Sequence, residues 1–359
     1  MCTGSEGVAL ALCWTLRAEM MGKVAGPSGK QASLVTLLER LAGGMACSDR
    51  RDRVFALLGL ASDANALGVE ADYRKSYDEV LVDVTVRIIQ QGNLYPLSVW
   101  THKNLDAGQC LPTWVCRWPS VGEEQSLIFG GNAAGQMSAD VRFSADRRCM
   151  HVSGTRVARI LQPTLGFNFG LSRPLSVAEL AQLVQLESVI STARTHLSTS
   201  IQHRSTADAT LVHTILAGSV GLDIDSEGNQ MMTAFLALVA MLRRHQQQLG
   251  EEDAKIELTT LIDSLPEDQK EHAYVIIRYE KTYGRVICFA DCGRICLAPA
   301  QAQVGDIVAV FGSGHNLYVI RPAGNNYRYV GDAYMYGLMN GEAMEKDGWE
   351  KAIETFSLV

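Results

Sequence analysis

The most informative stretch of the chain runs from Tyr283 to Tyr336 and reads YGRVICFADCGRICLAPAQAQVGDIVAVFGSGHNLYVIRPAGNNYRYVGDAYMY. Its apolar runs are short, rich in β-branched and aromatic residues, and separated by Gly, Asn and Asp. Gly305 with Asp306 is typical of a turn between strands, and Asn325 with Asn326 predicts a tight hairpin. Several short strands at such close spacing predict a small barrel or curled sheet.

Immediately upstream, the character of the chain changes to helical between residues 175 and 265. Ser176 and Glu179 have the spacing of a capping box, and Leu175 and Leu180 have the spacing of a hydrophobic staple. A second helix is predicted from Gln230 to about Gln248. Its buried face is expected to hold Met231, Phe235, Leu238, Val239 and Leu242.

The segment before the helical middle, residues 120–170, alternates short β-like runs with Gly-rich turns. Met150, Val152, Val157 and Ile160 occupy predicted strand positions within these runs.

The N-terminal third contains the clearest helix signal, in ADYRKSYDEVLVDVTVRIIQQG, residues 71–92. Ser76 and Glu79 form a capping box here, which predicts a helix from Ser76 through about Gln90. Its apolar face holds Tyr77, Val80 or Leu81, Val84 and Ile88. Two shorter helices are predicted before it. The first spans 31–41 with Leu34, Leu37, Leu38 and Leu41 on one face, and the second covers Val54 to Leu60 with Ser48, Asp49 or Asp52 as caps and Gly59 near its end.

Together these patterns predict an α+β protein with a helical middle region and a small C-terminal β-barrel-like subdomain. Four regions are expected: a loosely ordered arm at 1–30, a mixed helix and strand region at 31–175, a helical region at 176–282, and a small barrel with a C-terminal helix at 283–359.

Composition excludes several classes of function. The formal net charge is −7 and basic residues are scattered, so a nucleic-acid footprint is absent. The longest apolar run, Met231 to Leu242, is too short to span a bilayer, which needs about 20 residues. No signal peptide pattern is visible, so a cytoplasmic location without membrane contact is expected.

The nine cysteines are odd in number and widely spread, as in a protein from a reducing compartment. Cys288, Cys292 and Cys296 are spaced by four and could suggest a metal site. No fourth ligand stands at a zinc-ligand spacing, so buried small apolar cysteines are the favoured interpretation.

Two long motifs flank the helical middle. The first combines CSDRRDRVFALLGLASD, residues 47–63, with ADYRKSYDEVLVDVTVRII and LPTWVCRW, and the second is the stretch from Tyr283 to Met344. They are similar to segments of fungal heterokaryon-incompatibility (HET) domain proteins that read CSDPRDRVYALLGL, PDYSKSVEEVYIDVTRRLI and LPSWVPDW, and to the family's closing segment with VGD, LRP and GEAYVHGIMDGE. The resemblance covers most of residues 31–345 and is weakest in the helical middle.

The family's namesake N-terminal segment carries a YxALSYxWG-like motif, which residues 1–46 lack. In the family, that segment resembles a Toll/interleukin-receptor-type fold and is associated with cell death. We therefore expect either a truncated gene model or a stand-alone protein of a different function.

The motif residues have both a functional and a structural interpretation. Asp49, Asp52 and Arg53 could bind a ligand, but capping a helix and pairing with each other is the favoured role. Asp72 is expected to be a turn residue, and Tyr73 to be an anchoring aromatic residue.

A flexible loop is predicted at Gly312, Ser313 and Gly314, ahead of His315. His196 and His203 would share a helix face, whereas His151, His213 and His315 stand alone. No catalytic residue is identified, and neither a cofactor site nor a metal site is predicted.

Two hypotheses for the function follow. The first is a stand-alone HET-like protein repurposed to bind a small apolar molecule, with a cofactor-free cyclase of fungal specialised metabolism as its enzyme form. The alternative is a regulatory or protein-interaction module related to heterokaryon incompatibility. A closed apolar pocket would favour the first, and an exposed binding surface the second.

Overall fold

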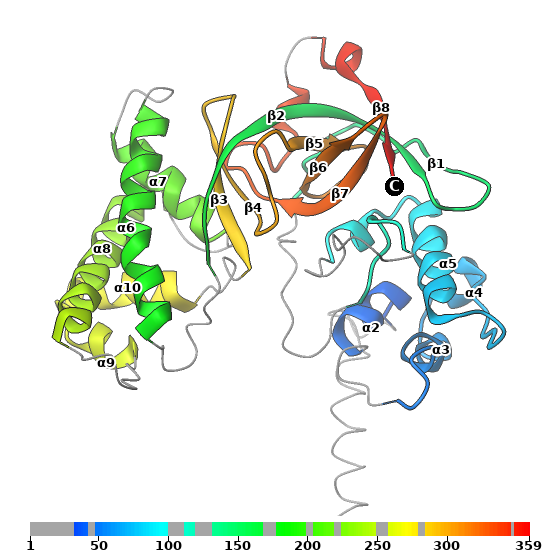
Figure 1. Cartoon of the computed structure of the whole chain (residues 1–359), viewed down its shortest axis with the longest axis horizontal. Coiled ribbons are helices and arrows are strands. Elements are labelled where there is room, and N and C mark those ends of the chain that lie inside the picture. Colours follow the sequence, from blue (N-terminus) through cyan, green and yellow to red (C-terminus); the bar gives the residue numbers. More distant parts are fainter. Residues whose placement is uncertain are drawn as a thin grey trace, which may run out of the picture.

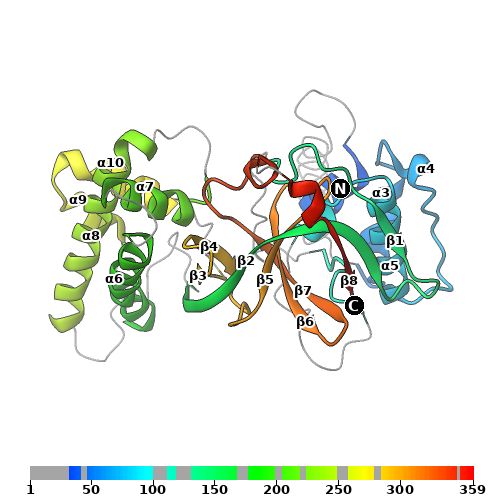
Figure 2. The same ribbon diagram turned by 90° about the horizontal axis from the view of Figure 1, so that it is seen from above.

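The computed structural model describes residues 32–41, 47–99, 111–118, 131–167, 177–198, 204–218, 224–248, 258–278, 284–345 and 348–359. A curved sheet occupies the centre of the molecule, with N-terminal helices at one end and a bundle of later helices at the other (Figure 1). The view from above shows the same order (Figure 2). The mixed architecture confirms the predicted α+β class with a helical middle and a C-terminal barrel.

The N-terminal part holds α2 (Leu34–Leu41), α3 (Asp52–Leu58), α4 (Ala64–Leu67), α5 (Tyr77–Gln90) and the short 3-10 helix η2 (Tyr95–Leu97). The capping box predicted for α5 is confirmed. The backbone N–H of Glu79 donates to the Ser76 hydroxyl at 3.3 Å, and the Ser76 N–H donates to the Glu79 carboxylate at 2.7 Å. The predicted apolar faces of α2 and α5 are buried, apart from Tyr77, which is partly buried.

The predicted caps of α3 are wrong. The helix begins at Asp52 after Arg51, and no side chain caps its first turn. The reason is that the Asp49 carboxylate is already bound by Arg51, at 2.6 Å from its Nη2. Gly59 follows the helix, as predicted.

The sheet contains eight described strands. They are β1 (Val141–Phe143), β2 (Met150–Phe167), β3 (Arg285–Ala290), β4 (Ile295–Pro299), β5 (Ile307–Phe311), β6 (Leu317–Ala323), β7 (Asn326–Ala333) and β8 (Glu354–Leu358). Their order is β4-β3-β2-β5-β6-β7-β8, and β8 also pairs with β2. Because β8 contacts both β7 and the first half of β2, it closes β2, β5, β6, β7 and β8 into a barrel.

β2 belongs to two parts of this sheet. Residues Met150 to Arg159 pair with β1, β5 and β8, whereas Ile160 to Phe167 pair with β3. The sequence predicted short runs broken by turns here, and the structure shows one continuous strand instead. Gly154 does not end the strand. A glycine is needed here for close packing, because a Cβ at this position would lie 2.4 Å from the carbonyl oxygen of Val310.

Two details at the C-terminal side differ from the prediction. The β6–β7 turn is formed by Gly324 and Asn325, one residue earlier than predicted, because Ala323 pairs with Asn326 and Gly324 takes a φ of 64°. The predicted C-terminal helix is replaced by a single 3-10 turn, η5 (Trp349–Ala352), followed by β8. The alternating burial of Phe356 and Leu358 fits a strand and not a helix.

The helical middle contains α6 (Val177–Ser198), α7 (Arg204–Ile215), α8 (Ile224–Gln248), α9 (Leu258–Asp263) and α10 (Glu267–Arg278). α8 begins six residues before the predicted start, and all five residues of its predicted inner face are buried. The predicted capping box of Ser176 and Glu179, with its Leu175–Leu180 contact, lies outside the described side chains. No described helix has an apolar stretch long enough to cross a bilayer.

The buried apolar residues form two clusters on the two sides of the sheet. One joins the helical middle to β3, β4 and parts of β5 to β7, and the other joins the N-terminal helices to the barrel residues Phe311, Tyr318 and Phe356. The four-region division remains a prediction, and the arm at 1–30 lies outside the described residues. β2, from the second predicted region, pairs with strands of the fourth.

Candidate functional site

The polar residues of the N-terminal motif hold two chain segments together. Arg51 donates through Nη1 to the carbonyl oxygens of Tyr73 and Lys75, at 2.5 and 2.8 Å. The Tyr73 hydroxyl donates to Asp52 at 2.6 Å, and this hydrogen bond is the main cause of the raised pKa of Tyr73. Asp49 and Asp52 therefore have partners within the fold, but the predicted role is wrong: neither caps α3, and they pair with Arg51 and Tyr73 instead of with each other.

Asp83 links three elements of this region through its carboxylate. Oδ1 accepts from Arg87 at 3.0 Å and from Arg147 at 2.7 Å, while Oδ2 accepts from Lys75 at 3.0 Å. Its side chain is only 9% exposed. Burial raises the pKa of Asp83, but the three hydrogen bonds together hold that pKa below its ordinary value. Sequence reasoning missed this cluster, because Arg147 lies 64 residues away in the β1–β2 turn.

The Gly312–Ser313–Gly314 segment is not the flexible loop that was predicted. A Cβ at Gly312 would lie 2.1 Å from the Ser138 carbonyl oxygen. The Ser313 N–H donates to Met137 O at 2.7 Å, and the Ser313 hydroxyl accepts from the Ala139 N–H at 3.0 Å. The segment is therefore a tightly packed turn.

Four of the described histidines, those singled out in the sequence, occupy separate environments. The His151 and His315 rings bond to the Ser357 hydroxyl and to the Gly131 carbonyl oxygen, respectively. His196 packs on Phe289 and His213 stacks on Tyr336. His203, predicted to share a helix face with His196, lies outside the described residues.

The buried-cysteine interpretation is confirmed for Cys288 and Cys296 and is wrong for Cys292. Cys288 and Cys296 lie opposite each other in the β3–β4 ladder and are buried. Burial raises the pKa of Cys288 to about 12. Cys292 is exposed in the turn between the two strands. Within the described ranges, no three His, Cys, Asp or Glu side chains are placed to hold one metal ion.

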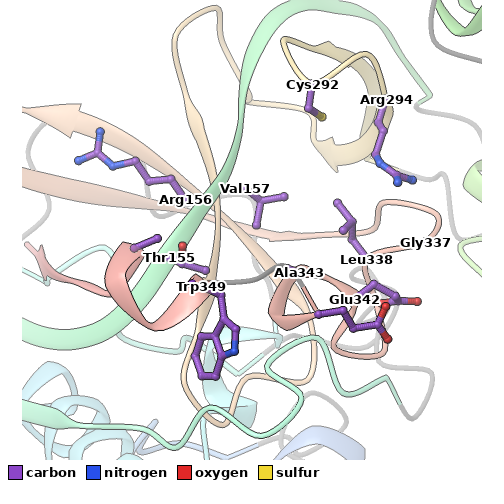
Figure 3. A pocket seen from close by; sticks show the side chains of 13 residues that line it. Thr155, Arg156, Val157, Cys292, Arg294, Gly337, Leu338, Glu342, Ala343 and Trp349 are labelled. Carbon is purple, nitrogen blue, oxygen red and sulfur yellow. The ribbon is translucent and has the colours of Figure 1, made fainter.

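An open pocket of about 440 Å³ lies beside β2, where three segments distant in sequence meet (Figure 3). β2 provides Thr155, Arg156 and Val157, and the β3–β4 hairpin provides Cys292 and Arg294. The third segment connects β7 to β8. It contains the 3-10 helix η4 (Glu342–Met344) and contributes Gly337, Leu338, Glu342, Ala343, Glu345, Gly348, Trp349 and Ala352.

The pocket combines an apolar surface with charges from different elements. In Figure 3, Leu338 lies between Arg294 and Glu342, and Val157 lies on the same side of β2 as Leu338. Arg294 donates to the Tyr336 carbonyl oxygen at 2.8 Å, and one Glu342 oxygen accepts from the Asn340 N–H at 2.7 Å. Among the described residues Arg294, Glu342 and Glu345 form no ion pair, so their charges are available to a bound group.

Arg156 has a different role, although it also lines the pocket. Its side chain points away from Leu338 (Figure 3) and forms a two-point ion pair with Glu354 on β8, at 2.5 and 2.9 Å. It also donates to the Tyr327 hydroxyl at 2.8 Å. Arg156 therefore ties β2 to β7 and β8, and holds one wall of the pocket in place.

The sequence did not identify this pocket, because its walls come together only when the barrel closes. A partial signal is present in the connecting segment, where Gly337, Gly341 and Gly348 all take positive φ values between 73° and 96°. Glycines at this density mark a segment that turns repeatedly over the sheet.

Comparisons with known proteins agree with the class that the fold defines, an α+β protein with a C-terminal β-barrel. Residues 231–356 match the family model of the Het-6 beta-barrel domain, a range that runs from within α8 through β7 into β8 and holds every pocket residue except the three on β2. The chain is also similar to "Heterokaryon incompatibility protein 6, OR allele" of Neurospora crassa, with 25% identity over 357 residues, 82% of this chain and 49% of that protein. The chain thus spans about half the length of this curated relative. No solved structure matches the chain.

These matches confirm the predicted resemblance to the C-terminal region of heterokaryon-incompatibility proteins.

Proposed function

We propose that the chain is a regulatory protein-interaction module related to heterokaryon incompatibility, and that the pocket beside β2 is its binding surface. The observation that carries the proposal is the set of three charged side chains, Arg294, Glu342 and Glu345, that form no ion pair with another described residue, around an apolar surface at Val157 and Leu338. An accessible surface with an apolar centre and a charged rim is typical of protein interfaces.

The alternative, binding of a small apolar molecule with or without cyclisation, remains a prediction. It requires an enclosed and mostly apolar cavity, which holds a flexible precursor in one conformation away from water. The pocket beside β2 is open and contains four charged side chains, Arg156, Arg294, Glu342 and Glu345. It therefore supports recognition of a polar surface better than folding of an apolar precursor.

The proposal can be tested by site-specific photo-crosslinking in the native host. A benzoyl-phenylalanine replaces Ala343, which lines the pocket, and in a control chain it replaces Ala66, an exposed residue of α4. We expect a defined protein adduct from position 343 alone. Arg294→Glu should abolish that adduct, whereas Arg142→Glu, in an exposed ion pair with Asp140, should not.

The crosslinked protein is then purified and its affinity measured by calorimetry. We expect Arg294→Glu and Glu342→Lys each to weaken binding at least about tenfold. Equal affinity of these variants and the unchanged protein would rule out the pocket as the interface. Turnover of a linear precursor by the dialysed protein in EDTA would instead support the cyclase hypothesis.

A further inference from the structure

One edge of β2 is interrupted at the pocket. β5 occupies one edge along Gly154 to Arg159; β8 pairs with Gly154 on the opposite edge, and β3 also lies across β2 from β5 in the strand order. β8 ends there at the pair Gly154–Glu354, and β3 begins at the pair Ile160–Ala290. Between these two pairs, no described strand covers the edge of β2.

Asp291, which follows β3, covers the end of the interruption that lies nearest to β3. The Arg159 N–H donates to the Asp291 carboxylate at 2.8 Å, and the Arg159 carbonyl oxygen accepts from the Asp291 N–H at 3.0 Å. No described strand therefore pairs with this edge from Thr155 to Ala158; Thr155 and Ala158 are buried, so Arg156 and Val157 are the accessible residues of the stretch. The pocket-lining residues of β2, Thr155 to Val157, lie in this stretch.

Val157 is the centre of the open stretch. The register with β5 shifts between Arg156 and Ala158, so Val157 is the extra residue of a β-bulge and has no partner in β5. Bulges are common beside binding sites, where they direct a side chain and end a ladder. Within the described part of the chain, Val157 thus lacks a strand partner on both edges, while its side chain lines the pocket.

We propose that the pocket binds an extended peptide segment of a partner protein, which adds as a short strand to β2 between β8 and β3. The inference rests on the proposed function and specifies how the partner is bound. An uncovered strand edge presents N–H and C=O groups that an extended peptide can pair with. A helix or a flat protein surface could contact the charged rim, but would leave these backbone groups unmatched.

The charges around the pocket define the peptide further. An acidic side chain near Arg294 and a basic side chain near Glu342 and Glu345 would complement the rim. Between them, alternate side chains of the peptide would face Val157 and Leu338, since successive residues of a strand point to opposite faces. The partner segment is therefore short, extended and of mixed charge, with small apolar residues at alternate positions.

The test uses the full chain and a displayed library of short peptides with a fixed Glu near one end and a fixed Lys near the other. Selection is made against the chain, with counter-selection on the Arg294→Glu variant. The best binder is synthesised as a series in which one backbone amide at a time is N-methylated, which removes a donor and leaves the side chain unchanged. Hydrogen exchange of the chain's own amides is followed with and without the peptide.

We expect N-methylation to weaken binding about tenfold or more at alternate positions, corresponding to one lost backbone hydrogen bond. We also expect slower amide exchange at Arg156 and Val157, with the amides of α5 as an unchanged internal control.

Two results would overturn the inference. The first is a binder that depends on Arg294 but tolerates N-methylation everywhere and leaves the β2 amides unaffected, a result that preserves the proposed function. The second is a library that yields no Arg294-dependent binder. In that event a protein crosslinked at position 343 would still support a folded partner, and absence of the crosslink would remove the proposed function as well.

Discussion

Arg285 and Asp332 form an ion pair in the interior of the molecule, with Nη2 2.7 Å from Oδ1 and side chains that are 1% and 0% exposed. Arg285 also donates to the Asp332 carbonyl oxygen at 2.9 Å. The other Asp332 oxygen accepts from the buried amide of Asn316 at 2.8 Å, and this amide also donates to Ser98 at 3.3 Å. The group connects the start of β3, the end of β7 and the segment that follows η2.

Removal of one partner of this pair should be costly. In Asp332→Leu the guanidinium of Arg285 stays buried without a counter-charge, and we expect a loss of about 3–5 kcal/mol in the free energy of unfolding. Chemical denaturation measures the loss. The double variant Arg285→Met with Asp332→Leu should recover most of it, because no uncompensated charge remains. If the double variant is as unstable as the single one, the pair stabilises the fold by more than the neutralisation of its two charges.

Asp83 should make stability depend on pH on the acid side. Its pKa is below the ordinary value in the folded protein, so its contribution is complete above the pKa of the unfolded chain, about 3.9, and is lost as the pH falls through the folded-state value. Asp83→Asn should lower stability at neutral pH by about 1–3 kcal/mol. The difference from the unchanged protein should shrink below about pH 4, in denaturation series recorded at several pH values.

Asp140→Asn provides the matched control for Asp83, since it also removes a carboxylate that is paired with an arginine. Asp140 and Arg142 are 61% and 77% exposed, so the change should alter stability by less than about 1 kcal/mol. Equal effects of the two substitutions would contradict the role assigned to Asp83.

The apolar face of α5 should be sensitive to truncation. Leu81 is 1% exposed and belongs to the N-terminal apolar cluster, so Leu81→Ala should cost about 2–5 kcal/mol. Val84→Ala, at 0% exposure, should also destabilise. Gln90→Ala, at an exposed position of the same helix, should change the denaturation midpoint little. An unchanged midpoint in Leu81→Ala is the result that would refute this packing.

The three C-terminal cysteines should differ in reactivity. The thiolate is the reactive form, and burial raises the pKa of Cys288 to about 12 and that of Cys296 well above its usual value. Iodoacetamide at neutral pH should therefore label Cys292 in the folded protein, and the other two only after unfolding. Peptide mass spectrometry distinguishes the sites. Rapid labelling of Cys288 under native conditions would show that the β3–β4 hairpin opens.

Some elements of this fold could be predicted from the sequence alone, and others could not. α5 could be predicted because its capping box and its apolar periodicity are both local. The length of β2 could not, because Gly154 looks like a break in the sequence and is accommodated only by the close approach of Val310. The sequence also predicted a helix where the structure has β8. Local patterns do not reveal this strand, because it is stabilised by pairing with β2 and β7.

The candidate site was less accessible to sequence reasoning than the fold. Its charged residues, Arg294, Glu342 and Glu345, carry no motif of catalysis or metal binding. They come together with Val157 only because the fold places β2, the β3–β4 hairpin and the connection from β7 to β8 around one pocket. The residues that did stand out in the sequence have partners near α3: Asp52 accepts from Tyr73, and Asp49 pairs with the Arg51 side chain.

The closure of the barrel by β8 has a consequence for synthesis on the ribosome. β2 is translated long before its neighbours β3, β5 and β8, and the entire helical bundle is made in between. The ladder from Met150–Leu358 to Gly154–Glu354 cannot form until residues 354–358 have left the exit tunnel. Until that moment the β8 edge of β2, from Met150 to Gly154, stays unpaired in the nascent chain, and an unpaired strand edge can pair with other chains or recruit chaperones. Vectorial synthesis therefore makes barrel closure a late and nonlocal step, whose rate is limited by chain topology.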